Sequence, residues 1–207
     1  MRIERKEQDQ KLKAAAKQAL DTVSSAASQT GRPCGSDCHR ECDKCGSTSC
    51  TCMCSRDCRF ISKTLTSDPE HFPLEERIAP LVFEINKLGI FTPNWSCEGH
   101  VGLDGKIWKI PRVWFYAESV LHVRLLADSL SKMSIEKKLK CPWQVVLTFT
   151  DNDNLDTTFS VEPVFEEAQK LSYKQLSDDI YVLAENIGPM VSARARELSR
   201  LTSIHLT

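Results

Sequence analysis

Apolar residues recur every three or four positions in four stretches of the chain, which is the spacing of a helix with one buried face. The first stretch lies within residues 1–29 and has only a thin apolar stripe, so it predicts a helix of low independent stability. Two more run from Pro80 to Leu88 and from about Ser119 to Met133. From Leu176 the pattern continues, and Gly188-Pro189 predicts a break between two helices. The residues predicted to face the core are Leu81, Val82, Ile85, Leu88, Val123, Leu126, Leu130, Met133, Leu176, Ile180, Leu183 and Ile187.

Between these helices the chain is rich in β-branched and aromatic residues, as strands are. Residues 89–117 predict two strands joined at Asp104-Gly105, a dipeptide that favours a type I′ hairpin turn. Residues 143–164 predict a second hairpin, with the polar residues 151–156 as its turn. The order is therefore helix, hairpin, helix, hairpin, helices. We expect an α/β (α+β) domain over residues 60–207, with mixed or antiparallel hairpins and packed helices.

Composition narrows the class of protein only slightly. The 207 residues, 41% of them hydrophobic, fit one ordinary domain with appendages. A formal net charge of -1 gives no global basic field, so contact with nucleic acid would need a local patch. No stretch approaches the roughly 18 consecutive apolar residues of a membrane span. Because acidic residues interrupt the first ten positions, a mitochondrial presequence is disfavoured, and we expect a protein of the reducing cytoplasm.

A cysteine-rich segment precedes the predicted domain. Eight of the ten cysteines fall in this segment, which has almost no apolar residues and cannot build its own hydrophobic core. Eight thiolates match two tetrahedral Cys₄ zinc sites, with an iron-sulfur cluster, thiol redox sensing or metal buffering as alternatives. The predicted metal ligands are Cys34, Cys38, Cys42, Cys45, Cys50, Cys52, Cys54 and Cys58, with His39 as an optional ninth.

The chain thus divides into three predicted parts. Residues 1–29 form a helical extension, residues 30–59 the cysteine-rich metal-binding segment, and residues 60–207 the α/β domain. The extension has two interpretations: a solvated appendage, or a helix that binds a protein partner or dimerises.

The stretch Ser-Cys-Glu-Gly-His places a thiol, a carboxylate and an imidazole together at Cys97, Glu98 and His100. In a regular strand Cys97 would point away from Glu98, but Gly99 allows a bulge that would bring His100 beside Cys97. His100 could then activate Cys97 as a nucleophile while Glu98 orients the imidazole, or the three could bind one metal. The alternative is an inert, buried Cys97 with Glu98 and His100 on the surface.

A family resemblance adds to this interpretation. The run IAPLVFEINKLGIFTPNWSCEGHVG, with KIWKI and AESVLHVRLLADSLSKM further on, resembles the family of the tRNA wybutosine-synthesising methyltransferase over about residues 75–165. The Ser-Cys-Glu-Gly-His form is also similar to that of uncharacterised bacterial and phage proteins. Glu98 stands where the family has serine, His100 where it has arginine, and Ser119 where it has proline. The residues that match its pattern are Ser96, Cys97, Gly99, Trp108, Glu118, Leu121, His122 and Val123.

The resemblance implies an enzyme that binds S-adenosylmethionine and a nucleic-acid base. Trp95, Trp108 and Trp114 would be the stacking surfaces, with ordinary core packing as the alternative. His122 would face the same cleft as His100, or be a satisfied residue at a helix start. The candidate cofactor-binding residues are Ser96, Gly99, Trp108 and His122.

These features lead to two hypotheses. The first is a soluble metal-binding protein whose α/β domain is an enzyme acting on a nucleotide or nucleic acid, with Cys97, Glu98 and His100 as catalytic residues and methyl transfer from S-adenosylmethionine as the implied reaction. The second is a non-catalytic zinc-binding interaction module or redox sensor.

Overall fold

The structure is a computed structural model that describes residues 10–26, 74–148 and 157–204. The predicted zinc-binding cysteines, Cys34 to Cys58, and the predicted turn at residues 151–156 lie outside these ranges. The described elements are α1 (Gln10–Ala26), α3 (Ala79–Lys87), β1 (Phe91–Cys97), β2 (His100–Val101), β3 (Ile107–Lys109), β4 (Arg112–Ala117), α4 (Val120–Ile135), β5 (Trp143–Thr148), β6 (Thr158–Pro163), α5 (Phe165–Ala168) and α6 (Tyr173–Ile204).

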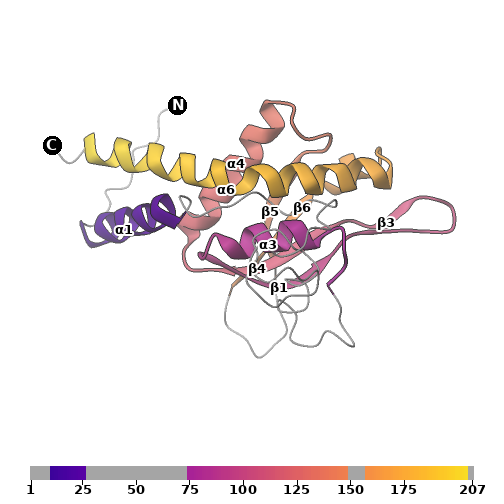
Figure 1. The fold of residues 1–207 in the computed structure, drawn as a ribbon, viewed down its shortest axis with the longest axis horizontal. Coiled ribbons are helices and arrows are strands. Elements are labelled where there is room, and N and C mark those ends of the chain that lie inside the picture. Colours follow the sequence, from indigo (N-terminus) through magenta and orange to yellow (C-terminus); the bar gives the residue numbers. More distant parts are fainter. Residues whose placement is uncertain (1–9, 27–73, 149–156, 205–207) are drawn as a thin grey trace, which may run out of the picture.

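The strands form one antiparallel sheet and a short ribbon that extends it. The sheet has four strands in the order β1-β4-β6-β5, and β2 pairs with β3 in a separate two-stranded ribbon. Figure 1 shows this ribbon, marked by β3, projecting from the body of the molecule. The α+β class and both antiparallel hairpins are confirmed.

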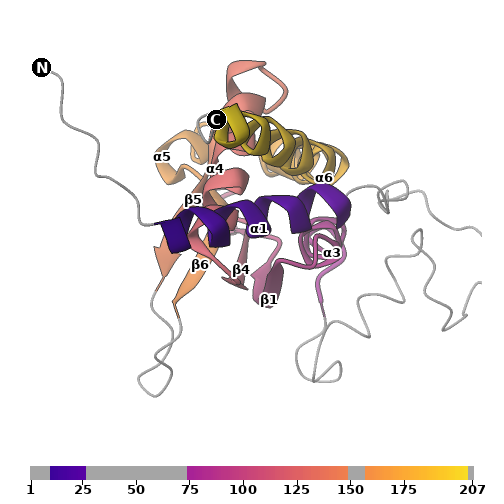
Figure 2. The same ribbon diagram turned by 90° about the vertical axis from the view of Figure 1, so that its left-hand side faces the viewer.

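The helices gather around α6 and enclose the core with the sheet. α3 packs against β1, α4 packs against β5 and β4, and α6 contacts α1, α3 and α4, as the two views show (Figures 1 and 2). Every residue predicted to face the core is buried. The sheet contributes Val113, Phe115 and Val161, which are completely buried.

Two residues explain where α3 ends and where α4 begins. Gly89, just after α3, adopts φ +68°, a left-handed conformation that ends helices and that glycine takes without strain. Ser119 caps α4, because its hydroxyl accepts a hydrogen bond from the His122 amide. These two ends fix where the chain enters β1 and where it leaves β4 for α4.

The predicted break at Gly188-Pro189 is wrong, because α6 is one continuous helix from Tyr173 to Ile204. Proline removes one hydrogen bond of a helix, to the carbonyl four residues earlier. Pro189 lies on the exposed face of α6, where water can solvate that carbonyl. Ile187 and Val191, on either side of it, are completely buried. Burial of the apolar face on both sides of Pro189 therefore outweighs the local penalty.

The first hairpin turn also differs from the predicted type I′. Gly105 has φ +75°, whereas Asp104 does not have the positive φ that a type I′ turn requires at both central positions. The Gly105 amide donates to the Gly102 carbonyl at 3.0 Å, and the Gly102 amide donates to the Lys106 carbonyl at 2.8 Å. The connection is thus a three-residue loop that ends in a left-handed glycine.

α1 docks on the domain through the predicted apolar stripe. Leu20 and Val23 are buried in the core, whereas Leu12, nearer the start of the helix, is exposed. The Ser199 hydroxyl of α6 donates to the Asp21 carboxylate at 3.1 Å. The described part of residues 1–29 is therefore an integral helix of the fold, which neither interpretation of the extension anticipated.

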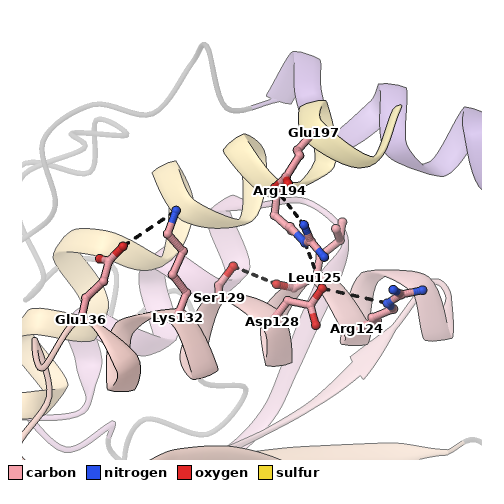
Figure 3. Close-up of polar contacts among 8 residues, drawn as sticks. All are labelled: Arg124, Leu125, Asp128, Ser129, Lys132, Glu136, Arg194 and Glu197. Carbon is pink, nitrogen blue, oxygen red and sulfur yellow. Dashed lines mark hydrogen bonds and ion pairs between the residues drawn. The ribbon is translucent and has the colours of Figure 1, made fainter. Parts of the chain in front are cut away.

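Charged side chains connect α4 with α6 at the surface (Figure 3). Arg194 donates from Nε to Oδ2 of Asp128 at 2.9 Å and from Nη1 to Oε2 of Glu197 at 2.8 Å. Arg124 approaches the same Asp128 oxygen to 4.0 Å. Because these ion pairs are partly exposed, they help to set how α6 lies on α4 but add little to the free energy of unfolding.

None of the helices in the described ranges is both long and apolar enough to span a lipid bilayer.

Candidate metal centre

Three side chains with metal-binding atoms converge where β1 ends. Cys97 is the last residue of β1, His100 is the first of β2, and Glu75 comes from the segment just before α3. Sγ of Cys97 lies 3.4 Å from Nε2 of His100, and the same nitrogen lies 3.4 Å from Oε1 of Glu75. The three ligand atoms are all within 4.8 Å of one another. We call these residues the Glu75–Cys97–His100 cluster.

Gly99 makes the approach of His100 to Cys97 possible. It has φ +86°, so the chain turns sharply between the two ligands instead of continuing as a regular strand. A Cβ atom there would lie 2.9 Å from the Pro111 nitrogen and 3.0 Å from the Lys109 carbonyl oxygen. The Gly99 amide also donates to Sγ of Cys97 at 3.4 Å. This hydrogen bond favours a thiolate, the form that binds metal.

The backbone next to Gly99 orients the carboxylate of the cluster. The Glu98 amide donates to Oε2 of Glu75 at 2.6 Å, which leaves Oε1 directed at His100. Metal-binding carboxylates are commonly held in this way by a hydrogen bond to the oxygen that does not bind. The segment before α3 is thereby fixed against the end of β1.

The Glu98 side chain points to a different group of residues. Its Oε2 accepts a hydrogen bond from the Arg77 amide at 3.0 Å, and its Oε1 accepts one from the Tyr173 hydroxyl at 3.2 Å. The Arg77 guanidinium lies 4.7 Å from the centre of the Tyr173 ring. Burial and the Glu98 charge raise the pKa of Tyr173 to about 12. The prediction that Glu98 orients the His100 imidazole is therefore wrong, because Glu75 takes that place.

Trp108 covers one face of the His100 imidazole. The two rings are stacked, with centroids 5.5 Å apart and planes 24° from parallel. Trp108 itself is 64% exposed, so it is not a core residue. Its ring restricts the orientation of the imidazole and leaves Nε2 directed at Cys97 and Glu75.

Cys97 is buried, and its surroundings affect the thiol in opposite directions. Burial raises its pKa most, and the Glu75 charge raises it further, whereas the Gly99 amide and the Lys109 ammonium lower it. The net pKa lies above the ordinary thiol value. Cys97 is thus a neutral thiol at neutral pH unless a cation displaces its proton. This disfavours the predicted role of a nucleophile that is already a thiolate at rest.

Two other predicted site residues, Ser96 and His122, are not part of the cluster. Ser96 is half-buried on β1 opposite Val113. His122 is buried in the first turn of α4, where its Nε2 lies 3.3 Å from the Ala19 carbonyl oxygen of α1. α4 begins just after β4, whose last residue, Ala117, pairs with Phe91 at the start of β1. Cys97 is at the other end of β1, six residues or roughly 20 Å away. His122 is therefore a contact between helices and does not share a cleft with His100.

The predicted stacking tryptophans are all on the first hairpin. Trp95 and Trp114 are register partners on β1 and β4, with ring centroids 5.0 Å apart. The Lys109 ammonium lies 4.9 Å from the centre of the Trp95 ring. Trp95 is 39% exposed, whereas Trp143 on β5 is buried in the core. Trp114 is half-buried, so the core-packing alternative fails only for the more exposed Trp95 and Trp108, and the stacking role of the three stays a prediction.

Sequence reasoning missed Glu75 as a partner of Cys97 and His100. It lies more than twenty residues before Cys97, and no spacing rule relates a residue before a helix to the end of the following strand. The Ser-Cys-Glu-Gly-His stretch offered the nearer carboxylate, that of Glu98. The packing of α3 against β1, together with the hydrogen bond from the Glu98 amide, brings Glu75 into place.

The chain matches no known protein in comparisons of three kinds. No model of a protein family matches it. No curated protein and no solved structure matches it either. The resemblance to the wybutosine-synthesising family therefore stays a prediction, and the function must be inferred from the geometry of the cluster.

Proposed function

We propose that the protein is a metal-binding enzyme whose centre is a single zinc ion held by Glu75, Cys97 and His100. The observation that carries this proposal is that one nitrogen, Nε2 of His100, faces both the Cys97 sulfur and a Glu75 oxygen at 3.4 Å. A catalytic cysteine, histidine and acid triad uses the two ring nitrogens for two different partners. A shared nitrogen is typical of donors that surround one cation.

The distances also fit zinc. With a Zn–S bond of about 2.3 Å and Zn–N and Zn–O bonds of about 2.0–2.1 Å, a tetrahedral site separates sulfur from nitrogen by about 3.6 Å and nitrogen from oxygen by about 3.4 Å. Both separations in the cluster are 3.4 Å. A thiolate and an imidazole favour zinc over magnesium or calcium, which prefer oxygen ligands.

Three protein ligands and a free fourth position are typical of catalytic zinc sites, whereas structural sites have four protein ligands. Within the described ranges, the cluster supplies three. The Glu75 and His100 side chains are 33% and 37% exposed, which gives water access to the remaining position. Zinc would lower the pKa of a water molecule there and make it a nucleophile, or polarise a substrate oxygen.

The proposal also fits the predicted compartment. Cys97 and Cys141 are the free cysteines of the described part of the chain. Zinc binding requires Cys97 to be reduced, and thiols stay reduced in the cytoplasm. A cytoplasmic location is therefore part of the proposal. The further predictions from the resemblance, S-adenosylmethionine as cofactor and a nucleotide or nucleic acid as substrate, are not needed for it.

A second candidate is a non-catalytic zinc-binding module. In its favour, the cluster joins three separate parts of the chain, as a structural zinc does: the segment before α3, the end of β1 and the start of β2. The two candidates differ at the fourth position. An enzyme binds small anions such as thiocyanate to the zinc, whereas a closed structural site excludes them.

Zinc analysis of purified variants tests the proposal. The full chain and the variants Cys97→Ala and His100→Ala are dialysed against trace zinc, and bound zinc is counted per chain by mass spectrometry. We expect each variant to hold one zinc fewer than the parent chain, whatever the cysteine-rich segment binds. Cys141→Ala is the control, because Cys141 is also a buried free cysteine but lies outside the cluster. Equal zinc in all four proteins would refute the proposal.

A further inference from the structure

Each of the two cluster ligands on the first hairpin has a cationic residue as its direct cross-strand partner. Cys97 of β1 is in register with Arg112 of β4, and His100 of β2 is in register with Lys109 of β3. Directly opposed residues of an antiparallel pair have Cβ atoms about 4.5–5.5 Å apart and point to the same face. The hairpin therefore places two cationic residues on the same face of the strands as Cys97 and His100.

Neither cation is fully neutralised by a neighbouring acid. Lys109 has no carboxylate within ion-pair distance among the described residues, and its ammonium lies over the Trp95 ring. Nη1 of Arg112 approaches Oε2 of Glu162 only to 3.8 Å, and that oxygen also accepts a hydrogen bond from Ser160. The Arg112 Nε is buried without a hydrogen-bond partner in the described part of the structure. Unpaired buried donors are rare and need an explanation.

The summed charge of the site is positive once a divalent ion is present. The Cys97 thiolate and the Glu75 carboxylate balance the two charges of the ion, and Glu162 offsets only part of the Arg112 charge. Lys109, the register partner of His100, remains as a surplus positive charge at the cluster. A partly enclosed site with such a surplus attracts an anion, and charge-assisted hydrogen bonds from lysine and arginine hold oxyanions well.

We propose that Lys109 and Arg112 form an oxyanion-binding subsite next to the metal centre, and that the substrate carries a phosphate-type or carboxylate group there. This inference rests on the proposed function for the metal, but the two cations belong to the chain with or without the ion. The subsite would orient the substrate so that its reacting atom faces the fourth position of the metal. Trp95, beneath the Lys109 ammonium, forms the apolar side of the subsite.

Isothermal titration calorimetry with sulfate and with acetate tests the subsite. The full chain is titrated in its zinc-loaded and zinc-free forms, with sodium chloride at equal ionic strength as the blank. We expect binding in both forms, tighter with zinc. Sulfate as the stronger ligand would indicate a phosphate-type group on the substrate, and acetate as the stronger ligand would indicate a carboxylate.

Substitutions assign the binding to the two cations. Lys109→Gln and Arg112→Gln should each weaken sulfate binding by about tenfold, the effect of losing one charge-assisted contact. Lys106→Gln is the matched control, because this lysine lies on the same hairpin with an 81% exposed side chain and pairs with Asp104. Circular dichroism checks that the variants fold. If Arg112→Gln does not fold, the effect of Lys109→Gln on sulfate binding decides whether the subsite exists.

The outcomes separate this inference from the proposed function. Absence of anion binding in both forms overturns the subsite, and so does binding that survives both substitutions, which would show an adventitious ion only. Zinc content is measured on the same samples. Lys109-dependent sulfate binding by a chain that takes no zinc at the cluster would support the subsite and refute the metal centre.

Discussion

The backbone amide of Glu98 donates a 2.6 Å hydrogen bond to the carboxylate of Glu75, whereas its own carboxylate binds Arg77 and Tyr173. Glu98 therefore binds the segment before α3 at two positions. Its amide donates to the Glu75 side chain, and its carboxylate accepts a hydrogen bond from the amide of Arg77, two residues after Glu75. Tyr173 adds the first turn of α6 to this arrangement. Glu98 acts through Glu75 and is a positioning residue for the metal centre.

Removal of the Glu98 carboxylate should weaken zinc binding without removing a ligand. Glu98→Ala leaves the Arg77 amide and the Tyr173 hydroxyl without their acceptor, and loss of such outer contacts typically costs 10–100-fold in metal affinity. Competition against a chromogenic chelator measures the affinity. Glu98→Gln should retain most of it, because an amide can accept from Arg77 and donate to Tyr173. The exposed neighbour Glu76→Ala is the control, and an equal loss there would contradict the positioning role.

Two glycines with similar backbone angles should differ sharply when changed to alanine. Gly105 has φ +75° and free space around it, so Gly105→Ala should lower the free energy of unfolding by about 1 kcal/mol from backbone strain. Gly99 has φ +86° and a Cβ there would meet Pro111 at 2.9 Å. Gly99→Ala should therefore cost about 2–4 kcal/mol and also weaken zinc binding. Urea unfolding of both variants tests this, and equal losses would contradict the close approach at Gly99.

Asp179 should make stability depend on pH in an identifiable direction. Its buried carboxylate accepts hydrogen bonds from the Lys140 and Cys141 amides and from the Trp143 indole, the latter at 3.3 Å. Burial raises its pKa above the ordinary value of 3.8. Between that value and the raised pKa, the folded state binds more protons than the unfolded state, so this contribution to stability is lost as pH rises.

The variant Asp179→Asn isolates that contribution, because asparagine does not titrate. It should unfold more easily by about 1–3 kcal/mol, since its amide group opposes donors. Measured from acid to neutral pH, the stability advantage of the parent chain over the variant should shrink as the pH rises above 3.8, the ordinary pKa of the carboxyl group. Guanidinium unfolding of both proteins across this range measures the difference. An advantage that grows with pH would show that the hydrogen bonds to Asp179 outweigh its burial.

Pro189 should be a position where substitution stabilises the fold. Pro189→Ala restores the backbone hydrogen bond of α6 and should raise the free energy of unfolding by about 1–2 kcal/mol, after the greater freedom of the unfolded chain is deducted. Ala193→Pro, at an exposed position one turn later, should instead cost about 3 kcal/mol. Thermal unfolding compares the two. Destabilisation by Pro189→Ala would show that the proline ring makes contacts that the helix needs.

The success of the sequence interpretation depended on how local each feature is. The apolar faces of α3, α4 and α6 and both hairpins follow from spacing within a few residues. The break predicted at Pro189 followed from a local rule about proline in helices, but burial of Ile187 and Val191 keeps the helix continuous. Cys97 and His100 were identified because they are near neighbours and Gly99 allows the turn between them. Glu75 could not be found, since its place depends on how α3 packs on β1.

Cobalt substitution tests the central claim most directly, because Co²⁺ occupies zinc sites and its visible spectrum reports both the geometry and the thiolate ligands. The parent chain, Cys97→Ser and Cys141→Ser are titrated with Co²⁺ under anaerobic conditions. The difference between the parent chain and Cys97→Ser should show one equivalent of a tetrahedral site with a thiolate-to-cobalt charge-transfer band, and thiocyanate should shift it. Cys141→Ser should match the parent chain. Identical spectra for the parent chain and Cys97→Ser would contradict a metal centre at Glu75, Cys97 and His100.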